Sequence, residues 1–331
     1  MRKTPVKLKA MDAEVCEALS DSKIFADLFN GSIFGGNQVI SPESLSPCSE
    51  KQTVTLPKEG SHSQIMKRFR DIKKEGTLGE GHLAVILSVE GQRLVHYGMP
   101  VRNMLYDAMD YTKQIQVLNH QNKRIKNQKT SAEYLSGLSS TDRLKPVLTI
   151  VFYYGENWMG PVCLHDLLDF PEELLPWKAY FPNYPLNLVS SANVDCHRFK
   201  TGLREVFELL KVSGSEAELE HLLETKKDYY SSLAEERSDL ISVFLDIPLL
   251  KEKKGFYKDK KGGVNVCTAI KEMVNHGEMR GKKLGLKKGE ECYNQLLKKL
   301  LTEDRIEDIR RLTEDRDYRQ QLYEEYNINK I

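Results

Sequence analysis

Long apolar runs are missing from this chain of 331 residues. No run approaches the ~20 residues that a helix needs to span a bilayer, and the polar, basic N-terminus lacks the apolar core of a secretory signal. The pattern therefore predicts a cytoplasmic protein without a membrane partner. Hydrophobic residues make up 40% of the chain and charged residues 29%, which is typical of a globular protein with much exposed helix.

Cysteine pairs at metal-binding spacing are missing as well. The six cysteines are Cys16, Cys48, Cys163, Cys196, Cys267 and Cys292. No two of them form a Cys-X-X-Cys pair, and no histidine joins them at zinc-finger spacing. Free thiols in a cytosolic protein are the expectation. Cys196 and His197 are adjacent, but neighbouring residues of a strand point to opposite faces, which argues against a nucleophilic pair there.

The chain has no excess of charge of one sign. Lysine and arginine number 49 and the acidic residues 48, so the net charge is +1. A protein that coats DNA through bulk electrostatics carries a clear basic excess, so that class is excluded and any DNA contact has to come from local basic patches. The length suffices for two units.

Residues 68–92 combine an isolated acid with a predicted buried strand. Asp71 lies inside a basic cluster made of Lys67, Arg68, Arg70, Lys73 and Lys74. A turn-rich break follows, with glycines at positions 76, 79 and 81. The apolar run 83–89 is short, partly β-branched and bounded by glycines, which predicts a buried strand that ends in Glu90, Gly91 and Gln92.

A hairpin would bring the two acids of this stretch together. Segment 65–71 is expected to pair with 52–56, and an Asp71 at the end of a strand beside 83–89 would lie next to Glu90. Two carboxylates that converge at one sheet edge form a site for a hard divalent cation such as Mg²⁺. An acid after a strand is more often a solvated turn residue, so both interpretations stay open on spacing alone.

The flanking segments predict the rest of an α/β fold. The run 146–154 predicts a second central strand and 186–190 an edge strand. Pro100 is at the favoured first position of a helix. The face of that helix expected to pack on the strand consists of Val101, Met104, Leu105, Ala108, Met109 and Ile115. We expect a disordered leader at 1–10, a basic surface loop at 120–129 and a small mixed central sheet flanked by helices.

Six segments occur in a fixed order over about the first 210 residues. They are FADLFN at 25–30, FRD at 69–71, VEGQ at 89–92, MPVRNMLYDAMDYTKQ at 99–114, LKPVLTIVFYYGENWMGP at 144–161 and LHDLL at 164–168. As a set they resemble the Rpn (YhgA-like) family of recombination-promoting nucleases, also described as transposases, within the PD-(D/E)XK nuclease superfamily. Gln92 stands where the superfamily usually has lysine. Rpn-like proteins often have glutamine there, which leaves the role of this position open.

The resemblance implies a metal-dependent DNA endonuclease linked to recombination or transposition, with Mg²⁺ or Mn²⁺ as the cofactor. It implies Asp71, Glu90 and Gln92 as catalytic residues, and Asp71, Glu90 and the carbonyl of Gly91 as metal ligands. An acid of the first helix sometimes helps at the metal site of such folds. Asp27 is the candidate here, with a solvated or capping role as the alternative.

The DNA contacts expected with this activity come from basic residues near the site: Arg68, Arg70, Lys73 and Arg102. For Arg102, pairing with Asp107 or a backbone carbonyl is the alternative. The nuclease-like domain is expected at 1–211. Because Gln92 lacks the charge of lysine, a catalytically degenerate protein that binds DNA or assembles it is the second hypothesis. A structural oligomer is the third.

Residues 212–331 are expected to form a helical C-terminal region, with a lysine-rich linker at 251–263. Gly277, Gly281, Gly285 and Gly289 recur every four residues. Each glycine weakens an isolated helix by ~1 kcal/mol relative to alanine, so this segment is expected to form on association, through which the chain would make a homo-oligomer. LTEDR occurs at 301–305 and 312–316, with Thr302 and Thr313 as expected N-caps.

Overall fold

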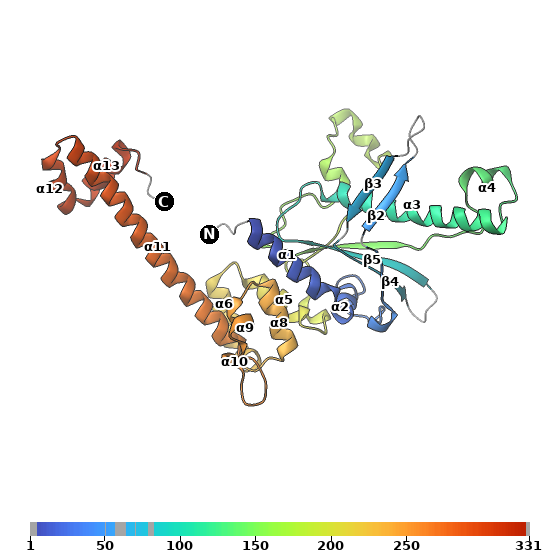
Figure 1. Cartoon of the computed structure of the whole chain (residues 1–331), viewed down its shortest axis with the longest axis horizontal. Coiled ribbons are helices and arrows are strands. Elements are labelled where there is room, and N and C mark those ends of the chain that lie inside the picture. The colour runs from blue at the N-terminus through green and yellow to red at the C-terminus, as the bar shows by residue number, and fades with distance from the viewer. Residues whose placement is uncertain (1–4, 50, 57–63, 70, 79–82, 329–331) are drawn as a thin grey trace. The chain divides into compact units, whose positions relative to one another are not determined.

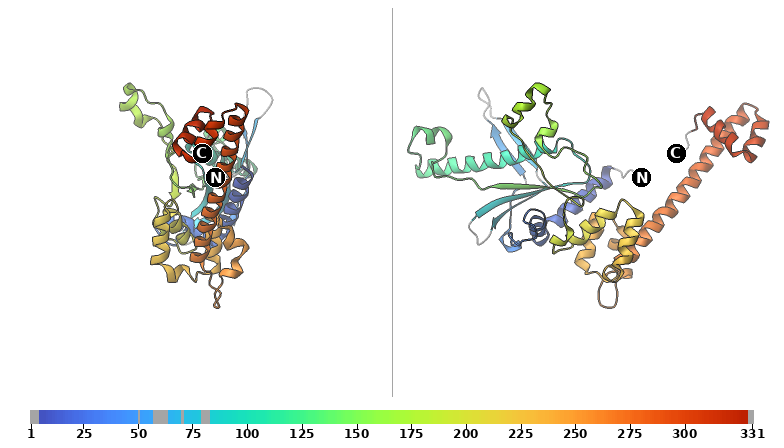
Figure 2. Two further views of the ribbon diagram at one scale, coloured as in Figure 1. Left: turned by 90° about the vertical axis from the view of Figure 1, so that its left-hand side faces the viewer. Right: turned by 180° about the vertical axis from the view of Figure 1, so that it is seen from behind.

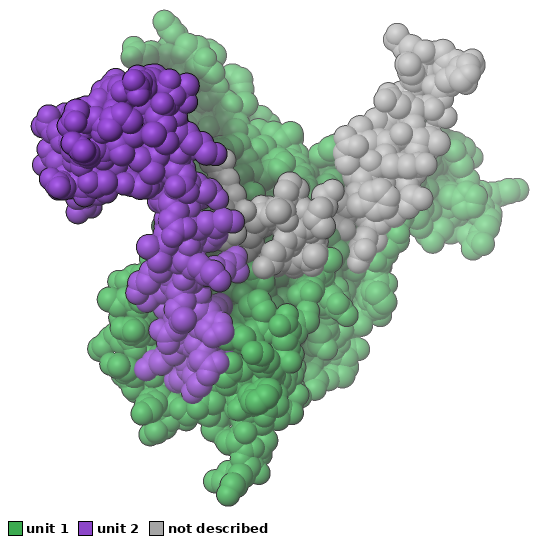
Figure 3. Space-filling view, turned by 60° about the vertical axis from the view of Figure 1, so that its left-hand side comes forward, with its two compact units in different colours: residues 1–266 green, residues 267–331 purple. Residues whose placement is uncertain are grey.

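The computed structural model describes residues 5–49, 51–56, 64–69, 71–78 and 83–328. The chain divides into two compact units, residues 1–266 and 267–331, which Figure 3 colours separately. The first unit is mixed α/β and the second is helical, so the expected fold class is confirmed at this level (Figure 1). Among the described helices, none has both the length and the apolar content needed to cross a membrane.

A five-stranded mixed sheet organises the first unit, in the strand order β1-β4-β5-β6-β7. The strands are β1 (Ser46–Pro47), β4 (Ile72–Leu78), β5 (Leu83–Gln92), β6 (Val147–Tyr153) and β7 (Asn187–Ser190). β4 pairs antiparallel with β1 and β5, whereas β5, β6 and β7 run parallel. The central strand β5 thus joins the two halves, in agreement with its continuous apolar run. The expected strands at 146–154 and 186–190 are confirmed.

The segment expected as a turn-rich break is partly a strand. Ile72 pairs with Val89 and Leu78 with Leu83, so Asp71 lies immediately before β4 and beside the end of β5. Gly76 lies inside β4, where an added Cβ would come 2.9 Å from Leu45 Cδ2. This glycine therefore permits close packing and does not mark a turn. The expected pairing of 52–56 with 65–71 occurs in a separate ribbon, β2 (Lys51–Leu56) with β3 (Gln64–Phe69).

One face of the sheet is apolar and is covered by helices. They are α1 (Pro5–Ser20), α2 (Ser22–Ser32), α5 (Leu203–Val212) and α8 (Glu235–Phe244). The Phe152 ring of β6 lies 5.5 Å from the Phe207 ring of α5 and 5.3 Å from the Phe244 ring of α8. α1 begins at Pro5, where a disordered leader was expected. Asp21 separates α1 from α2, because its carboxylate caps α2.

The other face of the sheet packs on α3 (Met99–Ile125) (Figures 1 and 2). Several buried side chains of this face are polar. The expectation that Val101 and Met104 pack on the strands is wrong, because these side chains are 45% and 36% exposed. Asn103, Asp107 and Asp110 are buried instead. Strand alternation places Lys73, Ser88, Glu90 and Thr149 on this face of the sheet. A polar strand surface is matched by a polar helix surface.

Helix α3 extends into the segment 120–129, where the sequence predicted a surface loop. α3 continues to Ile125 and ends at Lys126, which has φ 55° in the left-handed region. Residues 120–125 are thus helical, and only the following residues form a loop before α4 (Ser131–Ser136). Short 3-10 helices occupy the remaining connections of the sheet: η1 (Pro42–Ser44), η2 (Leu164–Leu167), η3 (Glu172–Tyr180) and η4 (Cys196–Arg198).

The lysine-rich segment 251–263 is not a loose linker. Helices surround it along the chain: α6 (Glu216–Thr225), α7 (Lys227–Tyr230), α9 (Pro248–Glu252) and α10 (Lys254–Tyr257). Val264 is fully buried and exchanges both backbone hydrogen bonds with Leu233. Leu250 and Tyr257 are buried as well. Residues 212–266 therefore belong to the first unit, whereas the sequence suggested a boundary at 211.

The second unit consists of most of α11 (Val266–Thr302), with α12 (Ile306–Glu314) and α13 (Arg316–Glu325). α11 is continuous through the four periodic glycines in the single chain. The hydrophobic core of the second unit consists of Leu296, Leu300, Leu312, Leu322, Tyr323 and Ile328. The threonines are not N-caps, because the Thr302 and Thr313 hydroxyls donate to the carbonyls of Lys298 and Arg310 in the preceding turn. Asp315 caps α13.

Candidate metal centre

A pocket of about 300 Å³ opens where β5 ends. Its lining comes from α1, from the residue before β4, from the end of β5 and from the first turn of α3. The lining residues are Asp12, Cys16, Asp71, Gly91, Gln92, Arg93, Leu94 and Arg102. Three residues expected at the metal site, namely Asp71, Gly91 and Gln92, thus share this pocket, together with the expected DNA contact Arg102.

Asp71 is held against the backbone of β5. The Gly91 N–H donates a 2.9 Å hydrogen bond to Asp71 Oδ2. Burial raises the pKa of Asp71, while Arg102 and the Gly91 N–H act in the opposite direction. The Asp12 carboxylate adds to the upward shift. Burial of the Asp71 carboxylate near the Asp12 carboxylate makes it a candidate for binding a cation.

Glu90 is on the α3 face of the same strand and is fully buried. Its carboxylate lies 3.0 Å from Nη2 of Arg102, which is 28% exposed. Arg102 also donates from Nε to the Tyr106 hydroxyl at 3.1 Å. Burial alone would lower the pKa of Arg102, but Glu90, Tyr106 and Asp71 outweigh it and raise that pKa. Arg102 therefore stays charged and is the internal cation that serves both acids.

The alternative expected for Arg102, a pair with Asp107, is not what the structure shows. Asp107 accepts hydrogen bonds from the hydroxyls of Thr149, at 2.7 Å, and Tyr184. Asp107 is thereby part of the buried polar layer beneath α3, next to the pocket lining.

Asp27 does not reach the pocket. Its buried carboxylate accepts hydrogen bonds from the backbone N–H groups of Lys200 and Thr201 and from the Thr201 hydroxyl. It therefore ties α2 to the segment before α5, which is a structural role. The acid that the first helix contributes to the pocket is Asp12.

Asp12 was missed because no motif marks it. The Tyr154 hydroxyl donates a 2.5 Å hydrogen bond to Asp12 Oδ1. Burial, then this hydrogen bond, raise the pKa of Tyr154. Both residues are remote in sequence from 68–92, so only the fold brings them to the same place. Cys16, Arg93 and Leu94 of the lining were missed for the same reason.

The expected DNA contacts separate into three groups. Arg102 lines the pocket. Lys73 is only 5% exposed and forms an ion pair with Asp110, so its ammonium group faces α3 and not solvent. Arg70 and the side chain of Arg68 lie outside the described residues.

Within the described ranges, one group of three residues has ligand atoms within 4.8 Å of one another, namely Asp195, Cys196 and His197. These residues lie at η4 and not in a strand, so the strand-based argument about Cys196 and His197 does not apply. Asp195 accepts a 3.0 Å hydrogen bond from the His197 N–H and lies 3.7 Å from Arg198 Nε. The closeness of these three residues is therefore explained by Asp195 as the N-cap of η4.

Comparison of the chain with protein-family models, with curated proteins and with solved structures finds no match in any of the three.

Proposed function

We propose that this protein is a Mg²⁺- or Mn²⁺-dependent DNA endonuclease with a PD-(D/E)XK-like active site, related to recombination or transposition. The observation that carries the proposal is the contact of the Asp71 carboxylate with the Gly91 backbone at the end of a central strand. Gln92 and Arg102 line the same pocket. An acid before one strand and an acid–X–glutamine run at the end of its neighbour match the motif order of the Rpn-like family.

In the proposed site the ligands would be the Asp71 carboxylate and the Gly91 carbonyl, which belong to residues of the pocket lining. The buried Glu90 carboxylate, which does not line the pocket, would join them only after Arg102 has moved away. These oxygen donors suit a hard divalent cation. A cation bound there would supply Lewis-acid stabilisation of the phosphate and a water of lowered pKa. Gln92 would orient the attacking water or a phosphate oxygen, but unlike lysine it adds no positive charge. The guanidinium of Arg102 would stabilise the negative charge that develops on the phosphate oxygens during cleavage.

In the proposed site, Arg102 and a metal ion are alternative cationic partners of Glu90. It lies in the first turn of α3, is partly exposed and compensates the fully buried Glu90. A DNA phosphate can accept two hydrogen bonds from a guanidinium. We infer that Arg102 would turn to the phosphate when DNA binds, and that a cation held by Asp71 and Glu90 would then supply the charge that Glu90 needs. Metal binding and DNA binding would therefore strengthen each other.

A plasmid-nicking assay tests this proposal. Wild-type protein should convert supercoiled DNA to open-circle or linear DNA with Mg²⁺ or Mn²⁺, and not with EDTA. Asp71→Asn should abolish the conversion without unfolding the protein. Cleavage in EDTA, or full activity of Asp71→Asn, would contradict the assignment.

A catalytically degenerate, DNA-binding protein is the second candidate, favoured by the Arg102–Glu90 ion pair. An arginine that permanently neutralises Glu90 would make a metal unnecessary for stability and impossible to bind there. In that case the wild type would shift a DNA fragment in a gel containing EDTA but would nick no plasmid with any divalent cation.

A further inference from the structure

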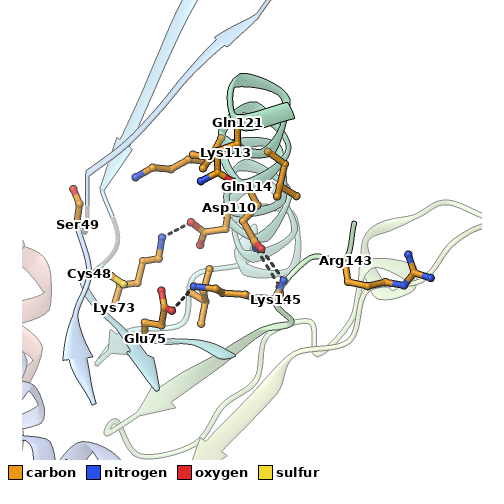
Figure 4. Close-up of a pocket in the computed structure, with 13 residues that line it drawn as sticks. Cys48, Ser49, Lys73, Glu75, Asp110, Lys113, Gln114, Gln121, Arg143 and Lys145 are labelled. Atoms are coloured by element: carbon orange, nitrogen blue, oxygen red, sulfur yellow. Dashed lines mark hydrogen bonds and ion pairs between the residues drawn. The ribbon is translucent and has the colours of Figure 1, made fainter. Parts of the chain in front are cut away.

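A second pocket, of about 350 Å³, lies farther along α3 (Figure 4). It is enclosed by the segment before β2, by β4 and β5, by the middle of α3 and by the segment before β6. The lining residues are Cys48, Ser49, Lys73, Glu75, Ile86, Asp110, Lys113, Gln114, Val117, Leu118, Gln121, Arg143 and Lys145. No residue of this set lines the pocket around Asp71.

The acids of this pocket are already compensated. Asp110 pairs with Lys73, and both side chains are buried. Glu75 pairs with Lys145. Figure 4 shows the two ion pairs side by side at the β4 wall. Neither carboxylate is therefore available to attract a cationic ligand.

The wall behind Lys145 is fixed by a side-chain amide. The Gln114 Nε2 donates to the Lys145 carbonyl at 3.1 Å, and the Lys145 N–H donates to Gln114 Oε1 at 2.7 Å. This double hydrogen bond attaches the segment before β6 to α3. The pocket is therefore held open by the fold and does not depend on a loose loop.

Two further cations carry the excess charge. Lys113 and Arg143 are exposed, and within the described residues neither forms an ion pair with an acid. Arg143 donates from Nη1 only to backbone carbonyls, at 2.7 and 3.1 Å. Burial raises the pKa of the Cys48 thiol, which therefore stays neutral near pH 7. With four cationic and two acidic side chains, the lining carries an excess of positive charge.

The remaining wall is apolar. Ile86 of β5 and Val117 and Leu118 of α3 line the pocket, and Val117 is 49% exposed although it is fully aliphatic. An apolar wall beside uncompensated cations suits a ligand that has an apolar body and an anionic end. We propose that this pocket binds a small organic anion of this kind, a phosphate ester or carboxylate with a flat apolar group. The apolar group would rest on Ile86, Val117 and Leu118, and the anion would contact Lys113. Arg143 adds positive charge on the other side of the lining, where its guanidinium points away from Lys113 (Figure 4).

This proposal does not depend on the nuclease assignment. Each pocket has its own buried polar contact under α3, Arg102 with Glu90 at the first and Asp110 with Lys73 at the second.

Isothermal titration calorimetry with 1-naphthyl phosphate tests the proposal on the full chain. The probe joins a flat apolar body to a phosphate, whereas 1-naphthol and inorganic phosphate each offer one half. We expect 1-naphthyl phosphate to bind at least about tenfold more tightly than either half. Lys113→Gln should weaken its binding about tenfold, since it removes a hydrogen bond to a charged group. Arg143→Gln should weaken binding less, because that guanidinium lies on the other side of the lining.

Two controls separate this pocket from the metal site and from general surface charge. Lys123→Gln removes an exposed cation of α3 outside the pocket and should leave the affinity unchanged. Asp71→Asn and added EDTA should also leave it unchanged. Val117→Glu should abolish binding through repulsion while the melting temperature stays near that of the wild type. Absence of binding, equal binding of inorganic phosphate, or equal weakening by Lys123→Gln would overturn the proposal.

Discussion

The guanidinium of Arg102 lies 3.0 Å from the carboxylate of Glu90, an acid with no exposed surface. A buried carboxylate is stabilised by hydrogen bonds or by a cation, and for Glu90 the contacting cation is Arg102. In the proposed metal site, Arg102 would therefore occupy the place of a cation beside Glu90 when no metal is bound. Its chemistry depends on whether Arg102 can be replaced by a divalent ion.

Arg102→Met tests this exchange. Removal of the guanidinium leaves Glu90 buried without its ion pair, so the free energy of unfolding should fall by about 3–5 kcal/mol without metal. Because Glu90 would then be available, Mg²⁺ should raise the melting temperature of the variant more than that of the wild type. Lys123→Met is the matched control. An equal Mg²⁺ response in variant and wild type would show that Glu90 does not bind the ion.

Asp71→Asn should stabilise the protein without metal in a pH-dependent way. Burial raises the pKa of Asp71 above its ordinary value of 3.8. The folded protein thus holds the proton more tightly than the unfolded chain, so the contribution of Asp71 to stability is present at low pH. It is lost as the pH rises through the raised pKa. Urea denaturation from pH 3.5 to 7 measures the free energy of unfolding of both proteins. The difference in favour of the variant should increase with pH and then become constant. A sharp loss of stability at pH 7 would make Asp71 a structural acid.

Asp27→Asn, in contrast to Asp71→Asn, should lower the stability of the folded protein. An amide cannot accept from all of the donors on Lys200 and Thr201, and its NH₂ group faces them. We expect a loss of about 1–3 kcal/mol in the free energy of unfolding. The Mg²⁺-dependent shift in melting temperature should remain that of the wild type. A loss of the Mg²⁺ shift in this variant would place Asp27 at the metal after all.

Truncation tests where the first unit ends. Cutting the chain after residue 250 removes Val264 and Val266, which are fully buried. We therefore expect that fragment to lose cooperative melting. A chain cut after residue 276 keeps these side chains and should melt cooperatively. Cooperative melting of the shorter fragment would show that the contacts of 251–266 are dispensable.

The strands were predictable because their patterns are local. Residues 83–89 and 146–154 are apolar runs that become β5 and β6, and Pro100 marks the start of α3. The predicted hairpin placed Asp71 beside Glu90. In the structure the strand paired with β5 begins after Asp71, and the Asp71 carboxylate contacts the Gly91 N–H. The residues 72–78 were misjudged because Gly76 was taken as a turn residue, whereas its small size is needed against Leu45.

The polar layer under α3 could not be predicted from periodicity. Val101 and Met104 have the spacing of a buried face, yet Asp107 and Asp110 are buried because the strands opposite present Thr149 and Lys73. Which face of a helix is buried depends on its partner, and the partner is distant in sequence. Asp12 was likewise out of reach, since only the packing of α1 brings it to the pocket.

Anomalous X-ray scattering from Mn²⁺-soaked crystals would locate the cation itself. We predict one strong peak in the pocket where β5 ends, within ligand distance of the Asp71 carboxylate and the Gly91 carbonyl, and absent from crystals of Asp71→Asn. Arg102 should have moved away from Glu90 in the metal-bound protein. No peak at Asp71, or a peak only at Asp195 and His197, would contradict the assignment of this pocket as a metal centre.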